Sequence, residues 1–191
     1  LTVTGPPFLV VPLGTFPSVS REGTLMFIPP GVAGMQELVW VDRTGAAVGT
    51  VGRALPGLST PAISPDGRHV AATSSEQQRS DIWVFDTTRD AQTRLTFVEG
   101  DKTFPAWSPS GDRVLFTWAT SPPGRSIAVQ RVDGTGQSQV IVKTRRSTTS
   151  AVSPDGRFVA YSESGTDVAK TGIDLWYAPM DGSAAAREFA N

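Results

Sequence analysis

The sequence has 191 residues, which is enough for one ordinary domain with a hydrophobic core. Its 17 Lys and Arg residues nearly balance its 18 Asp and Glu residues, so the charge excludes a protein that binds nucleic acid through a basic surface. The chain has no cysteine and one histidine, which excludes thiol chemistry and leaves too few ligands for a zinc site.

Four similar segments follow one another along the chain, and each contains a short turn motif that begins with serine. The motifs are SREG (20–23), SPDG (64–67), SPSG (108–111) and SPDG (153–156). Successive motifs are about 44 residues apart, which is a period typical of β-propeller blades. Pro and Gly in these motifs favour tight turns between strands.

Each segment is predicted to hold four strands in the same order. The first strands are expected at 16–20, 60–64, 104–108 and 150–153. The second strands are expected at 24–28, 68–74, 112–118 and 157–162. The third strands are expected at 37–42, 81–86, 126–132 and 174–180. The fourth strands are expected at 47–52, 93–97, 139–143 and 186–190. Four antiparallel strands joined by turns make one blade.

The second strands are apolar on both faces, as expected for blades that pack against each other. Val70, Val114 and Val159 share one offset in the repeat. Ala71, Leu115 and Ala160 follow them and point the other way. We therefore predict an all-β fold, a β-propeller built of four-stranded antiparallel blades with about four blades visible. The repeats run approximately over 14–52, 58–97, 102–143 and 148–191.

Residues 1–191 are expected to form a single propeller domain or a propeller fragment, and 1–13 add an extra outer strand at 8–12. The longest apolar run, at 6–13, is too short to span a bilayer, so no membrane insertion of this segment is expected. The ring could belong to a longer propeller, be completed by two chains, or close as a small ring of about four or five blades. If the chain exists alone, exposed blade faces predict a homo-oligomer.

The repeat resembles a known family. The strings SPDGR followed by a VA pair, then DIWVFD, TRLTF and FPAWSP, are similar to the TolB-like, WD-repeat-like repeat of bacterial β-propellers. The likeness covers about residues 14–191, and the first repeat departs from it at SREG, where Pro is missing. The string from LVWVDRTG to TRLTF looks most like the propellers of bacterial receptor-type Ser/Thr protein kinases. The resemblance implies a sensor or scaffold domain in the periplasm or outside the cell, while a cytoplasmic location stays open.

Catalytic candidates are few, and a structural interpretation competes with each. His69, Asp66 and Asp155 are the candidates for a hydrolase site. The other repeats carry Leu25, Arg113 and Phe158 at the offset of His69, which favours a packing position. The turn serines are expected to be structural hydrogen-bonding groups, because every repeat has one.

Carboxylates could hold a metal ion or serve a glycosidase. Asp66 and Asp155 are candidate calcium ligands in turns with glycine, although Asp-Gly normally serves the turn, and no cofactor is otherwise expected. Asp81, Asp174 and Glu37 recur before the third strands. This recurrence favours a repeated structural hydrogen bond over a pair of glycosidase carboxylates.

Binding residues are expected in the loops that differ between repeats. The variable loops are 29–36, 75–79, 119–125 and 163–172. They join second and third strands and should lie on one face, with the blade-to-blade connections 98–103 and 143–149 opposite. The candidate binding residues are Trp118, Arg125, Arg79 and Lys170. Trp83 and Trp176 match in register and are expected to fill the gaps between blades.

The sequence therefore predicts a non-catalytic propeller module that binds a protein, peptide or small ligand. It could be the sensor part of a larger receptor. The alternative is a hydrolase of lactonase, esterase or glycosidase type, with or without a metal ion, because propellers also host enzymes. A third alternative is a fragment with no function of its own.

Overall fold

The computed structural model describes residues 15–19, 25–28, 34–76, 79–120, 124–145, 147–164 and 172–189. These residues form strands and turns, arranged as four sheets of four strands each. Within them, no helix is long and apolar enough to cross a membrane. The expected outer strand at 8–12 and the first turn motif, at 20–23, lie outside the described residues.

Each sheet is one blade, and its strands pair in chain order. The first blade holds β1 (Thr15–Val19), β2 (Leu25–Ile28), β3 (Met35–Val41) and β4 (Ala47–Pro56). The second holds β5 (Ser59–Ile63), β6 (His69–Glu76), β7 (Arg79–Asp86) and β8 (Ala91–Arg94). The third holds β9 (Asp101–Trp107), β10 (Arg113–Thr120), β11 (Gly124–Arg131) and β12 (Gln139–Thr144). The fourth holds β13 (Ser147–Val152), β14 (Phe158–Ser164), β15 (Ile173–Pro179) and β16 (Arg187–Glu188).

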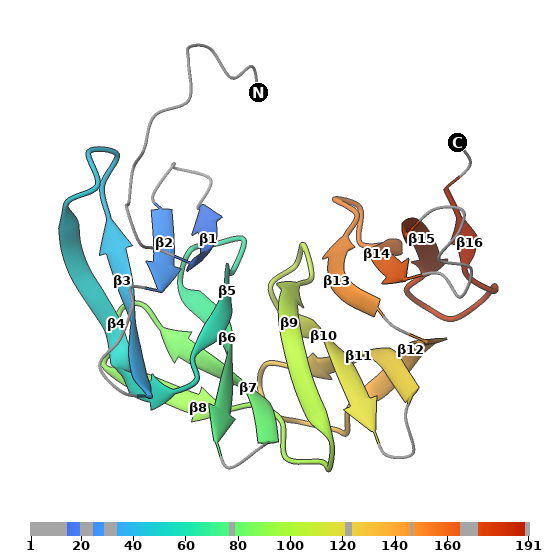
Figure 1. Ribbon diagram of the computed structural model, residues 1–191, viewed down its shortest axis with the longest axis horizontal. Coiled ribbons are helices and arrows are strands. Elements are labelled where there is room, and N and C mark those ends of the chain that lie inside the picture. The colour runs from blue at the N-terminus through green and yellow to red at the C-terminus, as the bar shows by residue number, and fades with distance from the viewer. Residues whose placement is uncertain are drawn as a thin grey trace.

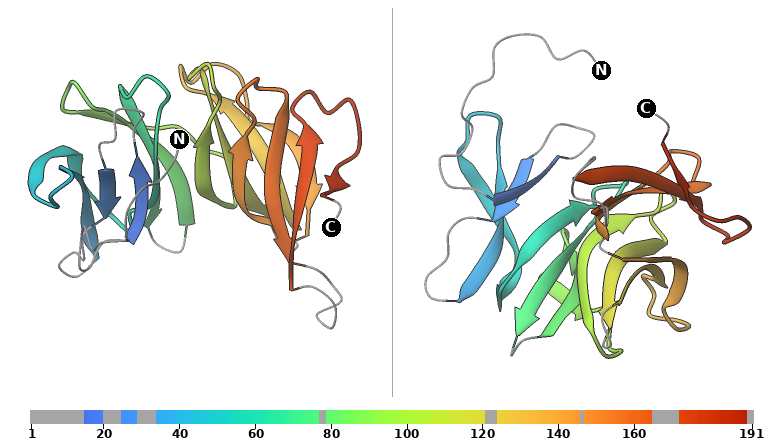
Figure 2. Two further views of the ribbon diagram at one scale, coloured as in Figure 1. Left: turned by 90° about the horizontal axis from the view of Figure 1, so that it is seen from above. Right: turned by 45° about the vertical axis from the view of Figure 1, so that its right-hand side comes forward.

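The blades follow one another in an arc, which confirms the predicted all-β propeller architecture (Figure 1). The first strands of successive blades lie next to each other, β1 beside β5, β5 beside β9 and β9 beside β13. These are therefore the inner strands, and β4, β8, β12 and β16 are the outer ones. Two further views show the same sequence of blades from other sides (Figure 2).

The three turn serines within the described residues are structural, as predicted. The Ser64 hydroxyl accepts a hydrogen bond from the backbone N–H of His69 (2.9 Å) and donates one to Asp66 (2.6 Å). Gly67, with φ of 71°, completes the turn in a backbone conformation that other residues rarely adopt. The hydroxyls of Ser108 and Ser153 accept from the backbone of the second strand in the same way.

A second repeated turn follows each third strand and was not singled out from the sequence. Its aspartate accepts a hydrogen bond from the backbone N–H two residues later. Asp-x-Thr or Asp-x-Ser is therefore the signal, because the short side chain closes the turn locally. The four aspartates are Asp42, Asp86, Asp133 and Asp181.

Three hydrophobic cores lie between successive blades. Val70 belongs to the core between the first and second blades, and Ala71 to the core between the second and third. Both residues are fully buried, so the second strand is covered on both faces as predicted. Trp83 and Trp176 pack against the first and third of these cores, which confirms that they fill gaps between blades.

After its turn, the first repeat differs by one residue from the register that the serine spacing predicts. Val19 pairs with Leu25, whereas Ile63 pairs with Val70 in the second blade. Five residues separate the first pair and six separate the second. The first turn is thus one residue shorter, and Leu25 matches Val70. The expectation that Leu25 occupies the offset of His69 is wrong.

Candidate functional site

The two ends of the strands carry different kinds of connection. We call the end with the serine turns the turn end, and the other the connection end. A chain that runs through four antiparallel strands returns to the end at which it entered the blade. The blade-to-blade connections therefore lie at the connection end together with the loops between second and third strands. The prediction that the two sets lie on opposite faces is wrong.

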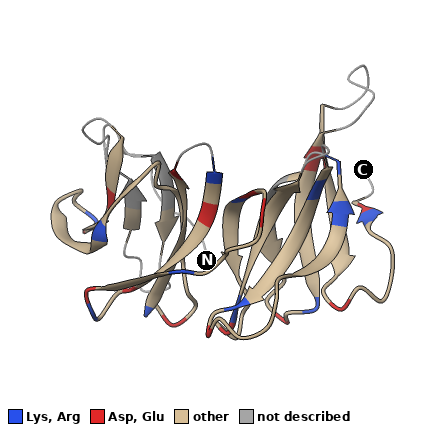
Figure 3. Cartoon of the chain, turned by 90° about the horizontal axis from the view of Figure 1, so that it is seen from below, with Lys and Arg blue, Asp and Glu red and all other residues tan. Residues whose placement is uncertain are grey.

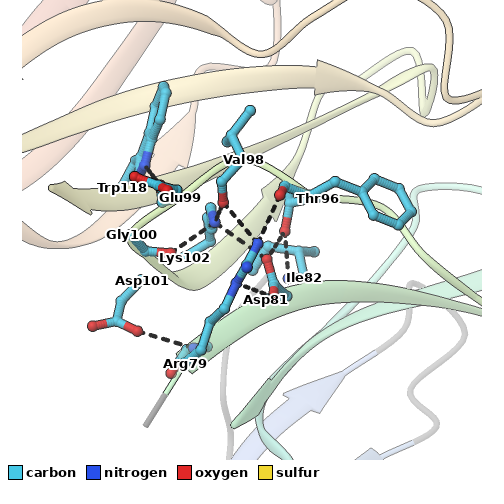
Figure 4. Close-up of polar contacts among 12 residues, drawn as sticks. Arg79, Asp81, Ile82, Thr96, Val98, Glu99, Gly100, Asp101, Lys102 and Trp118 are labelled. Atoms are coloured by element: carbon cyan, nitrogen blue, oxygen red, sulfur yellow. Dashed lines mark hydrogen bonds and ion pairs between the residues drawn. The ribbon is translucent and has the colours of Figure 1, made fainter. Parts of the chain in front are cut away.

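Asp81 lies at this connection end and joins the second blade to the third (Figure 4). It is buried, with 5% of its surface exposed. Its carboxylate lies 2.5 Å from Arg94 Nη2, 3.1 Å from Arg79 Nε and 3.2 Å from Lys102 Nζ. The Thr96 hydroxyl also donates to it (2.9 Å). One carboxylate is thus surrounded by three cations.

Lys102 is completely buried at the start of the third blade. Its ammonium group donates to the carbonyl oxygens of Val98 and Gly100, as well as to Asp81. Burial lowers the pKa of Lys102, and the attraction of Asp81 opposes this shift. The carbonyls and Asp81 together replace the water that the ammonium group has lost.

Beside Asp81, a pocket of about 220 Å³ opens at the connection end. It is lined by Ser74, Glu76, Arg79, Asp81, Trp83 and Arg94. The side chains of Arg79 and Arg94 are 40% and 32% exposed, so each is partly open to solvent at the pocket. The centroid of the Phe97 ring lies 5.1 Å from Arg94 Cζ, and Phe97 is 69% exposed. The ring therefore places an apolar surface beside the Arg94 guanidinium.

Three of the four predicted binding residues hold the blade-to-blade connections. Arg79 Nη2 donates to the carbonyl oxygens of Phe97 (2.7 Å) and Val98 (2.9 Å). Trp118 is half-buried, and its Nε1 donates to the carbonyl oxygen of Glu99 (2.7 Å). Arg125 Nη1 donates to the carbonyl oxygen of Ser147 (2.9 Å).

The structure brings Arg79 and Trp118 near the same connection, residues 95–100, and places Arg125 at the next one. Lys170 lies outside the described residues. The binding roles of these four residues stay predictions. A ligand at this end would meet Arg79, Trp118 and Arg125 already hydrogen-bonded to backbone carbonyl oxygens.

The catalytic candidates lie at the turn end, away from this pocket. The hydroxyls of Ser64 and Ser153 donate to Asp66 and Asp155, and these bonds lower the pKa of each carboxyl. The two aspartates belong to the second and fourth blades, and the structure does not bring them together. The ring of His69 lies 6.2 Å from that of Trp107 in the third blade, a packing contact between blades.

The calcium interpretation of Asp66 and Asp155 rests on the same two turns. Among the described residues, no three His, Asp or Glu side chains gather where they could hold a metal ion. Charged residues lie mostly at strand ends and in turns, with basic and acidic residues interspersed (Figure 3). The turn carboxylates are engaged by their own serine hydroxyls and by backbone N–H groups.

The expected repetition of a structural bond before each third strand is wrong. Glu37 and Asp174 occupy the positions that match Asp81 in the strand register. Glu37 is exposed and Asp174 is half-buried, whereas Asp81 alone binds three cations within the described part of the chain. The cluster is therefore a feature of the second blade and not of the repeat. Sequence reasoning missed Arg94, Thr96 and Lys102, because only the fold brings residues 94–102 against Asp81.

The chain matches one family of propellers over most of its length. Residues 33–177 match the family model of the TolB beta propeller domain. The chain belongs to this family. The match runs from the third strand of the first blade to the third strand of the fourth, so it includes the second and third blades whole and parts of the other two.

Members of the TolB beta propeller family and other propellers are similar to this chain. The Tol-Pal system protein TolB of Alcanivorax borkumensis is 33% identical over 82 residues, which are 42% of this chain and 19% of that protein. The crystal structure of TolB from Acinetobacter baumannii has a TM-score of 0.71 at 21% identity, over 89% of this chain and 41% of that one. The chain thus spans less than half the length of that TolB.

Enzymes share the fold as well. The acylaminoacyl peptidase of Pyrococcus horikoshii has a TM-score of 0.60 at 14% identity, over 93% of this chain and 32% of that one. At such identity the likeness concerns the fold alone. The predicted likeness to receptor-kinase propellers stays a prediction.

Proposed function

We propose that this TolB-family propeller is a non-catalytic module that binds an acidic segment of a protein or peptide at its connection end. The observation that carries the proposal is the excess of cations around Asp81. Arg79, Arg94 and Lys102 share the buried Asp81, and Glu76 is the second carboxylate that lines the pocket, so three cations face two carboxylates and the positive charge in excess favours a further anionic group. The exposed ring of Phe97 offers an apolar contact beside it.

Several contacts favour binding over hydrolysis at this pocket. Its serine, Ser74, donates its hydroxyl to the carbonyl oxygen of Pro56 (2.9 Å). His69 lies at the other end of the same strand, β6, and so cannot act as a base for this serine. The hydrolase alternative draws support from the shared fold only.

The proposal also gives the module a place in a larger system. Membership of the TolB family and the likeness to a Tol-Pal system protein favour a periplasmic or extracellular location. In that location the propeller would be the recognition part of a longer receptor or scaffold protein. The receptor-kinase resemblance of the sequence agrees with such a role.

A selection from random displayed peptides tests this proposal. We expect the peptides retained by the wild-type domain to be enriched in Asp and Glu, and the same selection on the Arg79→Ala variant to lose that enrichment. The Arg68→Ala variant is the matched control, because Arg68 is an exposed arginine in a turn at the other end. Purified domain should give no turnover on ester, lactone, peptide and glycoside panels. Reproducible turnover on any of these substrates would contradict the proposal, and so would an enrichment in Asp and Glu that the Arg79→Ala variant retains.

A further inference from the structure

The outer strand of the second blade, β8, lies between two hollows on opposite faces of its sheet. We call the face toward the first blade the front face and the face toward the third blade the back face. Arg94 pairs with Trp83, which packs against the core between the first and second blades. Thr93 pairs with Val84, which belongs to the core between the second and third blades. Because side chains of a strand alternate between its faces, Arg94 lies on the front face, and Thr93 and Leu95 lie on the back face.

The front hollow is the cationic pocket described above, and the back hollow is a groove between two blades. We call the second one the back groove. It measures about 390 Å³ and lies between the segments 93–98 of the second blade and 130–138 of the third. Phe97 and Val98 line it and are 69% and 38% exposed. Arg94 lines both hollows, so an extended segment along β8 would have cations on one side and apolar side chains on the other.

The free edge of β8 offers backbone hydrogen-bonding groups between these two hollows. The N–H of Leu95 donates to the carbonyl oxygen of Ile82 in β7 (2.8 Å), so Leu95 and Thr93 turn their backbone groups toward β7. The N–H and C=O groups of Gln92 and Arg94 point the other way. β8 is the last strand of its sheet, so no further strand pairs with it in the described part of the chain. Such an edge is a template for an added strand.

We propose that the ligand adds to this edge as a fifth strand of the second blade, with acidic and apolar residues alternating along it. The ligand is the acidic segment of the proposed function, on which this inference rests. In an added strand, every second side chain lies on the front face, near Arg79 and Arg94, and the others lie in the back groove beside Phe97. Backbone hydrogen bonds to Gln92 and Arg94 supply affinity, and the two faces supply specificity.

Charge complementarity distinguishes β8 from the other outer strands of the described blades. β8 lies beside the three cations that share Asp81, and one of them, Arg94, belongs to β8 itself. β4 and β12 each carry one basic residue, Arg53 and Lys143, and β16 is only two residues long. An acidic strand is therefore expected to add to β8.

Two capped peptides of equal composition separate strand addition from binding by charge alone. In acetyl-Thr-Val-Glu-Val-Glu-Val-Thr-amide the acidic and apolar residues alternate, and in acetyl-Thr-Val-Val-Val-Glu-Glu-Thr-amide they form blocks. Only the alternating peptide can place both Glu side chains on the front face, so it should bind at least about tenfold more tightly in calorimetric titrations. Equal affinities would overturn strand addition and leave the proposed function standing. Absence of binding by either peptide would overturn both.

Hydrogen exchange of individual amides, followed by NMR, locates the added strand. With saturating alternating peptide, the N–H groups of Gln92 and Arg94 should exchange at least about tenfold more slowly, because they gain hydrogen-bond partners. The N–H of Leu95 is the matched control, because it already donates to Ile82 and should change less. Equal slowing at all three amides, or slowing at none, would overturn strand addition.

Phe97→Ala tests the apolar side of the added strand. It should weaken binding of the alternating peptide about fivefold, and binding of a version with Ser in place of Val less than about twofold, because the ring contributes only where an apolar side chain meets it. Val48→Ala is the control, because Val48 is 62% exposed on the outer strand of the first blade and should leave both affinities unchanged. An equal loss for the two peptides in Phe97→Ala would overturn the alternating pattern.

Discussion

Lys102 and Asp81 join two blades through an ion pair that is shielded from water. Lys102 Nζ lies 3.2 Å from Asp81 Oδ1, and the two side chains are 0% and 7% exposed. Lys102 begins the inner strand of the third blade, and Asp81 stands at the start of a strand in the second. The pair therefore fixes the position of the third blade against the pocket on which the proposed function rests.

Removing the charge of Asp81 should destabilise the domain strongly. Asp81→Asn leaves Lys102 buried without its carboxylate, and loss of one partner of a buried pair costs about 3–5 kcal/mol. Asp174→Asn is the matched control, because Asp174 occupies the same register position in the fourth blade and is half-buried. That change should cost no more than about 0.5 kcal/mol. Urea unfolding of both variants measures the difference, and equal costs would show that the cation cluster adds little.

The connection between the second and third blades should not tolerate a side chain at Gly100. Gly100 has φ of +90°, and a Cβ there would overlap the carbonyl oxygen of Ala119 and lie 3.0 Å from Trp118 Nε1. Gly134 is the control, because it has φ of +73° and a Cβ there would meet open space. Gly134→Ala therefore adds backbone strain without a clash, and it should lower the free energy of unfolding by about 1 kcal/mol. Gly100→Ala should cost at least about 2 kcal/mol more because of the overlap. Thermal unfolding of the two variants checks this prediction, which fails if their melting temperatures agree.

The turn aspartates should make the domain sensitive to acid. Hydrogen bonds lower the pKa of each of these carboxyls in the folded chain, chiefly from the Arg131 guanidinium at Asp133 and from serine or threonine hydroxyls at the others. As pH falls, the unfolded chain, with carboxyl pKa values of about 4, binds protons first, so the free energy of unfolding decreases. It should be level above about pH 5 and fall steadily below about pH 4.

Urea titrations at several pH values measure this dependence. Ser153→Ala removes the hydroxyl that lowers the pKa of Asp155 most, so this variant should lose less stability between neutral and acidic pH than the wild type. A wild-type stability that does not change below pH 4 would contradict the role of these turns.

The repeat in the sequence was sufficient to predict the fold. Serine and glycine recur in all four turn motifs, and proline in three of them, because every blade must turn from its first strand into its second. Val70 and Ala71 point to opposite faces of the same strand, and both are apolar. This pattern predicted that the blades pack against each other on both faces. The first repeat was harder to align, because its turn lacks proline and is one residue shorter than the others.

The candidate site was predictable only in part. Arg79 was singled out because it lies in a variable loop, and it does line the pocket. Lys102 was not, because lysine is normally exposed and nothing near it in sequence indicates burial. The cluster depends on three segments meeting at one end of the strands. The direction of the strands places the blade-to-blade connections at this end too, contrary to the expectation that they lie on the opposite face.

The central claim is that the pocket beside Arg79 binds acidic ligands, and a fluorescence anisotropy titration tests it most directly. The probe is a labelled peptide rich in Asp and Glu. It is titrated with the wild-type, Arg79→Ala and Arg68→Ala domains at neutral pH in a buffer without urea. We predict saturable binding that weakens between about 0.1 M and 1 M salt. Arg79→Ala should weaken it about tenfold, and Arg68→Ala should leave it unchanged. Absence of binding, or an equal loss in both variants, would contradict the account.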